Sequence, residues 1–388
     1  TRSKNCEKLH VNVLSSTKRK KLKTVWHSPF SISSLFCFIF NYRFFNSLII
    51  FFQFISNFLF VNANVYGNLS GTLPGGSSLN LSSNPQFVNG GAGNYGLAVS
   101  SPAINSGAGY QYYGLPDKDL AGTDRVVGSQ IDRGALESGV DDNTTAFVTN
   151  VADNGSNTAP LAGSLRAAIK AANGAGGPYK IKFSISGSCP RIINMTTPML
   201  DITGKVTIDA RTQSGWSANT DYGRFDANLC IVVNGSGSTP YAFHVPSSAA
   251  SARLVVHGMM FAGFTDAAIK MENGSDHRIA GNQFGAVPFT SANGAAVRIT
   301  GASGGAVIGG FDDPSAVNLI AGSSVAGIYL DNASGGNTLG NNVIGFQPDG
   351  TSLGSNTIGV YVFNSPNNTL LYNYIGHSTS NGVSISGA

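Results

Sequence analysis

Short apolar runs alternate with turns rich in Gly, Asn and Ser from residue 266 to residue 388. The runs are rich in Val and Ile, and five of them share one pattern, at residues 268–271, 296–299, 327–330, 359–362 and 382–385. A second element has Asn, any residue, a large apolar residue and then Gly or Ala, at residues 282–285, 318–321, 342–345 and 373–376. This pattern predicts short β-strands joined by tight turns.

The spacing of these elements indicates a solenoid. The shortest complete step is 23 residues, from Val360 to Val383, and the longer steps carry insertions at 310–315 and 347–352. Insertions at fixed points of a short period are typical of stacked turns whose loops leave one side. A leucine-rich repeat has a similar period, but Leu is sparse here. We therefore predict an all-β fold, a parallel β-helix whose turns stack about 4.8 Å apart.

The Asn that recurs in the second element has two explanations. Asn282, Asn318, Asn342 and Asn373 either form an inward-facing ladder or supply the left-handed backbone conformation that a tight turn needs. In a ladder, each amide would hydrogen-bond the amides above and below it. The sequence leaves both explanations open.

The composition supports this fold and excludes some partners. Gly accounts for 49 of 388 residues and only 11% of the residues are charged, which fits a β-rich extracellular solenoid better than a disordered or a helical chain. The formal net charge is +4, but eight basic residues lie near the start: Arg2, Lys4, Lys8, Lys18, Arg19, Lys20, Lys21 and Lys23. The remainder is mildly acidic, so we expect no nucleic-acid partner.

The cysteines also bear on the compartment. Cys189 and Cys230 lie in the body of the chain and would pair as a disulfide in a secreted protein; two free buried thiols are the alternative. Cys6 and Cys37 belong to the N-terminal segment. The chain has no His and Cys spacing typical of a metal site, and we expect neither a metal ion nor another cofactor.

Residues 1–63 do not resemble the rest of the chain. A basic stretch precedes a Phe-rich apolar run from Phe44 to Phe60, and small residues up to Ala63 follow it. This order is typical of a secretory signal or an uncleaved membrane anchor. Translated non-coding sequence, or two joined genes, would give a similar composition. We expect membrane contact only through this segment, and an extracellular or outer-cell-surface location.

Residues 64–140 form a separate block. Its motifs are N-P-Q-F-V at 84–88, S-P-A-I-N-S-G at 101–107, D-L-A-G at 119–122 and I-D-R-G-A-L-E at 131–137. The block resembles the C-terminal end of bacterial surface β-helix proteins of the choice-of-anchor type, although Asn105 and Arg133 depart from the usual residues. The resemblance implies a structure that closes the end of a β-helix.

The charged residues of this block have two interpretations. Asp119, Arg125, Asp132 and Glu137 would form a catalytic group if the fold gathered them at one point. The alternative is an Arg paired with carboxylates that locks the end of the solenoid and covers its exposed edge. We favour the structural interpretation.

Residues 141–388 carry the β-helix itself. Residues 141–162 are a linker or a first strand, with the strand at 147–150. One helix is predicted from Gly163 to Asn173, capped by Ser164, with an apolar face made of Leu165, Ala168, Ile169 and Ala172. This short N-terminal helix would cover the open end of the solenoid.

A second resemblance covers this region. Strands at 181–185 and 206–209, with G-S-L-R-A-A-I at 163–169 and T-Q-S-G-W at 212–216, resemble the start of a bacterial family of right-handed, pectate-lyase-like β-helices. The resemblance implies a right-handed solenoid that is secreted or surface-attached, and it implies little about activity. The repeat stops in mid-pattern at Ala388, so we expect further turns to be missing.

Candidate chemistry is sparse. The fold resembles that of β-helix enzymes that cleave acidic polysaccharides, which need carboxylates beside a basic residue for Ca²⁺-dependent lyases, or an acid and base pair for hydrolases. The most polar cluster, Asp276, His277 and Arg278, supplies weak catalytic candidates, and a solvated turn is the alternative. The insertions supply weak binding candidates: Asp312, Asp313 and Asp349.

Two functions follow from these observations. The first is a structural, adhesive or glycan-binding role for a secreted or surface-displayed β-helix, with a polysaccharide or cell-surface glycan as partner. The second is a polysaccharide lyase or glycoside hydrolase on the same fold. Convergence of carboxylates and basic residues on one face would favour the enzyme.

Overall fold

The computed structural model describes most of the chain after residue 82. The described residues are 83–107, 119–123, 131–134, 136–138, 144–288, 291–310 and 313–387. The predicted leader at 1–63, Arg125 and Asp312 lie outside them. Within this part of the chain, no helix is long and apolar enough to cross a membrane.

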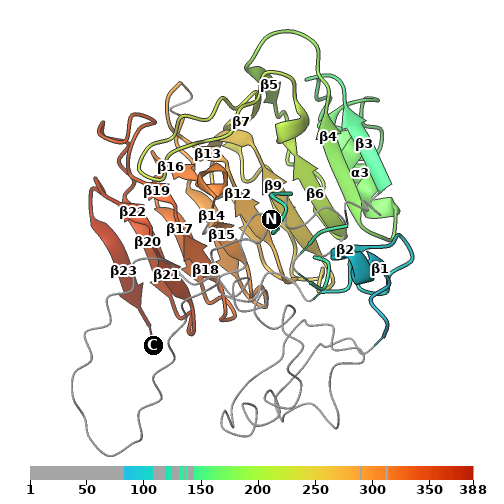
Figure 1. Ribbon diagram of the computed structural model, residues 1–388. Coiled ribbons are helices and arrows are strands. Elements are labelled where there is room, and N and C mark those ends of the chain that lie inside the picture. Colours follow the sequence, from blue (N-terminus) through green and yellow to red (C-terminus); the bar gives the residue numbers. More distant parts are fainter. Residues whose placement is uncertain are drawn as a thin grey trace, which may run out of the picture. The chain divides into compact units, whose positions relative to one another are not determined.

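Residues 144–387 form a right-handed parallel β-helix made of three parallel sheets (Figure 1). The eight-stranded sheet contains β3 (Thr144–Val148), β4 (Tyr179–Phe183), β6 (Lys205–Asp209), β9 (Arg253–His257), β12 (Arg278–Ala280), β15 (Val307–Gly309), β18 (Thr338–Gly340) and β21 (Thr369–Leu371). The seven-stranded sheet contains β5 (Arg191–Asn194), β7 (Ile231–Thr239), β10 (Met259–Phe264), β13 (Gln283–Phe284), β16 (Leu319–Ile320), β19 (Val343–Ile344) and β22 (Tyr374–Ile375). The six-stranded sheet contains β8 (Phe243–Val245), β11 (Ala267–Met271), β14 (Ala295–Thr300), β17 (Ala326–Asp331), β20 (Ile358–Phe363) and β23 (Asn381–Ser386).

The predicted repeat corresponds to two of these sheets. The five Val- and Ile-rich runs lie in β11, β14, β17, β20 and β23 and stack in register. Val360 pairs with Val383, so the predicted step of 23 residues is one turn of the solenoid. The second element lies in or beside β13, β16, β19 and β22 of the seven-stranded sheet. The sequence pattern did not define the third strand of each turn, which is only three residues long in β12, β15, β18 and β21.

The recurring asparagines form the ladder. Asn318 Nδ2 donates to Asn342 Oδ1 at 3.0 Å, and Asn342 Nδ2 donates to Asn373 Oδ1 at 2.8 Å. Asn282 joins them, because its backbone N–H donates to Asn318 Oδ1 at 2.9 Å. The left-handed backbone conformation lies one residue before the ladder in three turns, at Gly281, Asn341 and Tyr372. The ladder explanation is therefore confirmed, and the turn explanation is wrong for these four positions.

The side chains that fill the solenoid are almost wholly apolar. One continuous core cluster runs from Val148 in β3 to Val362 in β20 and includes the inward-facing residues of all three sheets. Aromatic rings stack inside it, and the rings of Phe261 and Phe284 lie 5.1 Å apart in adjacent turns. Burial of these apolar surfaces is the main stabilising contribution to the stacked turns.

The predicted helix is α3 (Leu165–Gly174), and it lies beside β3 and β4 at the N-terminal end of the β-helix (Figure 1). Ser164 caps it, with its hydroxyl accepting a hydrogen bond from the backbone N–H of Ala167 at 3.2 Å. The predicted apolar face is confirmed, because Leu165, Ala168, Ile169 and Ala172 are all buried in the main core. The helix therefore covers apolar side chains of the first strands.

The block at 64–140 is described in part. It contains a short antiparallel pair, β1 (Phe87–Asn89) and β2 (Asn94–Leu97), joined by the 3-10 turn η1 (Gly90–Ala92). Its carboxylates accept hydrogen bonds from backbone N–H groups of the same block: Asp119 from Ala121, Thr123 and Glu137; Asp132 from Asn105 and Ser138; Glu137 from Asp132. These contacts fold the block on itself and fit a structural role for the three acids.

Candidate functional site

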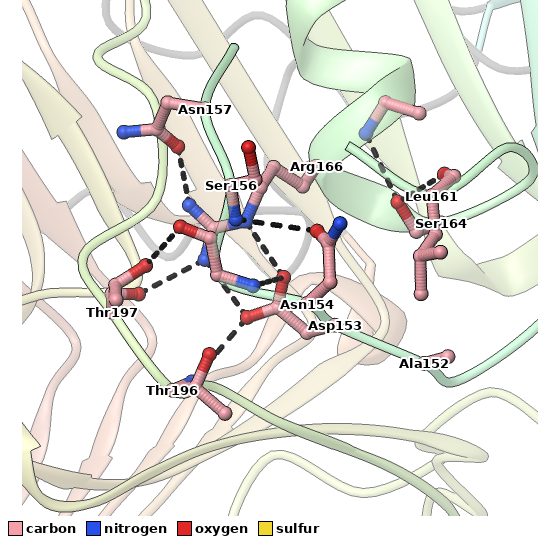
Figure 2. A network of polar contacts seen from close by, with 12 residues as sticks. Ala152, Asp153, Asn154, Ser156, Asn157, Leu161, Ser164, Arg166, Thr196 and Thr197 are labelled. Atoms are coloured by element: carbon pink, nitrogen blue, oxygen red, sulfur yellow. Dashed lines mark hydrogen bonds and ion pairs between the residues drawn. The ribbon is translucent and has the colours of Figure 1, made fainter. Parts of the chain in front are cut away.

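A deeply buried polar network surrounds Arg166 of α3, and its role is structural. The Arg166 guanidinium pairs with both carboxylate oxygens of Asp153, at 2.6 and 2.8 Å, and both side chains are almost completely buried (Figure 2). It also donates to the carbonyls of Thr197 and Pro198. The charge of Arg166 holds the pKa of Asp153 below its usual value, although burial alone would raise it. A ligand has no access to these groups, so the network fixes the loop at 151–162 onto α3 and the loop at 196–198.

The predicted catalytic cluster lies at the start of β12, and its side chains do not point to one site. His277 is fully buried, and Arg278 follows it in a strand, where neighbouring side chains face opposite ways. Asp276 lies in the preceding turn in the left-handed conformation. The solvated-turn alternative is wrong for His277 and Arg278, which are 0% and 7% exposed.

His277 occupies a position of a second side-chain ladder. The register of the eight-stranded sheet aligns Leu254, His277, Ala306, Asn337 and Asn368 in successive turns. His277 Nδ1 accepts from the N–H of Leu254 at 2.9 Å, as Asn337 Oδ1 does from Ala306 and Asn368 Oδ1 from Asn337. His277 Nε2 lies 2.9 Å from the carbonyl of Asn273 and donates to it, so the imidazole is neutral.

Burial lowers the pKa of His277 to about 4. The hydrogen bond to the carbonyl of Asn273 acts in the opposite direction, and the nearby charge of Arg253 lowers the pKa further. A histidine held neutral between two backbone groups is a structural ladder member.

The predicted binding residues in the insertions stabilise their own turns. Asp313 caps η3 (Pro314–Ala316) by accepting from the N–H of Ser315 at 2.8 Å. Asp349 accepts from the N–H groups of Thr351 and Ser352 and from the Ser352 hydroxyl, which lowers its pKa to about 2. Both carboxylates therefore have local partners.

The two insertions lie against a third segment, residues 213–229, which we call the strap. The strap links η2 (Ala210–Thr212) to β7. Its Asn219 side chain donates to the carbonyl of Pro314 at 3.1 Å, and the N–H of Phe225 donates to the carbonyl of Pro348 at 3.0 Å. A disulfide between Cys189 and Cys230 lies at the end of the strap.

The strap covers the outer face of the seven-stranded sheet. Outward side chains of that sheet form a second apolar cluster with the strap, separate from the core: Phe225, Leu229, Val232, Met260, Ala286, Val317, Leu319, Ala321, Val343 and Phe346. Trp216 packs against the edge of this cluster. The insertions thus help to hold the strap on an apolar sheet face.

The outer face of the six-stranded sheet is polar, and we call it the polar face. Its central outward column is His244, Lys270, Arg298, Tyr329, Tyr361 and Ser384, which pair in register from β8 to β23. Carboxylates of Asp201, Asp266, Glu272 and Asp331 lie beside the first four of these residues or contact them. This face gathers acidic, basic and aromatic side chains from successive turns.

The charged groups of the polar face form one alternating chain. Asp201 lies 2.7 Å from His244 Nδ1, and Glu272 lies 3.4 Å from His244 Nε2. Lys270 Nζ is 3.0 Å from Glu272 and 3.3 Å from Asp266. Arg298 bridges Asp266, at 2.7 Å, and Asp331. The order is acid, His, acid, Lys, acid, Arg and acid.

The pKa shifts of Glu272, Lys270 and Arg298 all favour the charged forms of these groups. Burial on its own raises the pKa of Glu272, but the hydrogen bond and charge of Lys270 outweigh it and the net pKa is lowered. Burial lowers the pKa of Lys270, but Glu272 and Asp266 raise it above its ordinary value. The pKa of Arg298 is likewise raised by Asp331 and Asp266 against the effect of burial. These three side chains therefore stay charged and remain ion-paired at neutral pH.

Aromatic rings continue the polar face beyond the charged groups. The rings of Tyr329 and Tyr361 stack in adjacent turns, 4.8 Å apart and 10° from parallel. The guanidinium carbon of Arg298 lies 5.1 Å from the centre of the Tyr329 ring. At the other end, Tyr241 stacks on His244 with ring centres 4.4 Å apart. Aromatic groups thus flank the chain of charges.

Sequence reasoning missed this face, although Asp266 and Glu272 lie close together in the sequence. A usable signal was present, because the third residue of three predicted strands is large and polar: Lys270, Arg298 and, in the next turn, Tyr329. The same position is Tyr361 one turn later. Asp201 and Asp331 gave no such signal, because they meet the column only through the stacking of turns.

Within the described ranges, no three His, Cys, Asp or Glu side chains are grouped as a metal site would require. The fold defines the class of the protein as a right-handed parallel β-helix. No family model matches the chain, and no curated protein has a similar sequence.

Proposed function

We propose that this protein is a secreted or surface-displayed β-helix that binds a glycan along its polar face. The observation that carries the proposal is the stacked pair of Tyr329 and Tyr361 beside a row of paired charges on one sheet face. Aromatic rings offer apolar surfaces for the faces of sugar rings, and fixed polar groups offer hydrogen bonds to hydroxyls. A polymer lying along the solenoid axis would meet an equivalent position in each successive turn.

Two further observations fit this location and role. The disulfide between Cys189 and Cys230 is typical of an oxidising compartment. The sequence resembles bacterial surface β-helix proteins in its two regions, and the block at 64–140 resembles the end of such a solenoid. Both support an extracellular, adhesive role.

A polysaccharide hydrolase or lyase is the second candidate. The observation in its favour is that Asp266 and Glu272 share the ammonium of Lys270 on the polar face. A hydrolase, however, needs one carboxyl with a raised pKa to serve as general acid, and the pKa of Glu272 is lowered. Binding therefore agrees better with the electrostatics of the site.

The test of binding is affinity electrophoresis and calorimetry of the full chain against a panel of soluble polysaccharides. We expect Tyr361→Ala to weaken binding about tenfold or more, because Tyr side chains dominate such contacts. The matched control is Tyr372→Ala, which removes a tyrosine that is 78% exposed between β21 and β22, away from the polar face. Equal loss in both variants, or no binding to any polymer, would contradict the proposal.

The enzyme is tested on the same panel by release of reducing ends and of unsaturated sugars. Turnover that Glu272→Gln abolishes, while binding remains, would replace the binding role by catalysis. We expect no such turnover.

A further inference from the structure

The alternating chain on the polar face has more acids than bases. It begins at Asp201 and ends at Asp331, and each basic member contacts two carboxylates: Lys270 contacts Glu272 and Asp266, and Arg298 contacts Asp266 and Asp331. The four carboxylates outnumber the three basic side chains, which are His244, Lys270 and Arg298. The chain therefore has a net negative charge, and its cations are already paired.

This arrangement is unfavourable for an acidic glycan. A uronate would have to separate Lys270 or Arg298 from a carboxylate at about 3 Å and approach the remaining acids. The acid at the start of the chain is more accessible, because the Asp201 side chain is 48% exposed and contacts the chain through His244. A cation in solution can reach it.

A second feature of the site also points to a ligand. The His244 side chain is nine-tenths buried, yet among the described residues the acid that faces its Nε2, Glu272 Oε1, lies 3.4 Å away, which is long for a hydrogen bond. Buried polar atoms in proteins are nearly always hydrogen-bonded. A hydroxyl group, which can donate or accept, would satisfy this nitrogen, and an ammonium group beside it would pair with the carboxylates of Asp201 and Glu272.

We infer that the polar face selects glycans that carry protonated amino groups, with an ammonium bound at Asp201, His244 and Glu272 and the sugar rings continuing toward Tyr329 and Tyr361. This inference rests on the proposed glycan-binding function and narrows it to an amino-sugar polymer. It also departs from the acidic polysaccharides that the resemblance to β-helix enzymes implies.

The test compares glucosamine oligomers with N-acetylglucosamine oligomers of the same length, binding to the full chain in mildly acidic buffer. The two differ at each unit in one acetyl group, which removes the charge of the nitrogen. We expect the glucosamine oligomer to bind about tenfold more tightly, and added salt to reduce this difference. Galacturonate oligomers should bind most weakly.

Asp201→Asn should reduce the preference about three- to fivefold, since it removes one partly exposed charge. The matched control is Asp221→Asn in the strap, whose side chain is 42% exposed and lies away from the polar face. A change in Asp221→Asn equal to that in Asp201→Asn would overturn the assignment to this site. The salt dependence of binding to the unaltered chain tests the contribution of charge without any substitution.

The outcomes separate this inference from the proposed function. Equal binding of charged and acetylated oligomers, or stronger binding of galacturonate, overturns the inference and leaves glycan binding in place. Failure to bind any glycan overturns both.

Discussion

The outer faces of two sheets of the solenoid differ in polarity: that of the seven-stranded sheet is apolar and covered, and that of the six-stranded sheet is charged. The outward positions of the seven-stranded sheet include Val232, Leu319 and Val343, which are completely buried under the strap and the insertions. The equivalent positions of the six-stranded sheet include Lys270 and Arg298, which are 18% and 27% exposed. The same turns carry both faces, so the two faces differ in their outward residues and in the insertions that hold the strap on one of them.

The comparison changes where a ligand site is expected. Insertions in a solenoid are natural candidates for binding loops, and those at 310–315 and 347–352 were predicted to be so. In the described residues of both insertions, backbone carbonyls instead hold the strap. In the part of the chain that the structure describes, the face without such a covering is the one that gathers paired charges and stacked rings.

The largest effect should come from the covered face. Phe225→Ala removes a ring that is 3% exposed in the cluster between strap and sheet. We expect the free energy of unfolding to fall by about 3–5 kcal/mol, as for other buried Phe residues. Urea denaturation measures it, with Tyr329→Ala on the polar face as the counterpart, for which we expect about 1 kcal/mol. Similar losses in the two variants would remove the distinction between the faces.

The second test concerns the interior that both faces share. The folded protein holds His277 neutral with a pKa of about 4, against an ordinary value of 6.5. The unfolded chain therefore binds this proton first, so the stabilisation is complete above pH 6.5 and is lost as the pH falls toward about 4. The difference corresponds to about 3 kcal/mol.

Denaturation at a series of pH values measures this loss. His277→Asn places in the ladder the residue that Asn337 and Asn368 supply in two later turns, and it should fold with the Leu254 hydrogen bond intact. We expect this variant to lose the part of the pH dependence that lies between pH 6.5 and about 4. An unchanged pH profile would mean that His277 is not the group that titrates.

The smallest effect on stability should come from the polar face. Arg298→Met breaks the chain between Asp266 and Asp331, but partly exposed ion pairs contribute only about 1 kcal/mol or less. We expect the substitution to weaken glycan binding, and the loss in binding free energy should be much larger than the loss in the free energy of unfolding. The control is Arg224→Met in the strap, which removes a pair with Asp221 whose Arg side chain is 66% exposed. If Arg298→Met costs several kcal/mol and leaves binding intact, the polar face is a structural element like the covered one.

Local signals explain what was predictable. The Val- and Ile-rich runs, the Asn element and the Ser164 cap each act within a few residues, so their strands and the helix α3 were found from the sequence. The strands of the third sheet were too short for a periodic signal in most turns. The sequence did not reveal His277 as a ladder residue, because the equivalent residues in two later turns are Asn337 and Asn368.

The sequence by itself determined the class of fold, because stacked turns require the same short apolar pattern in each repeat. Only the tertiary structure decided which outward residues meet. Asp201, Lys270 and Asp331 belong to different turns, and the steps between turns vary with the insertions, so no fixed spacing in the sequence relates them. Parallel strand pairing places successive turns side by side in register. Charged side chains that are far apart in the sequence therefore lie within hydrogen-bond distance and form one polar face.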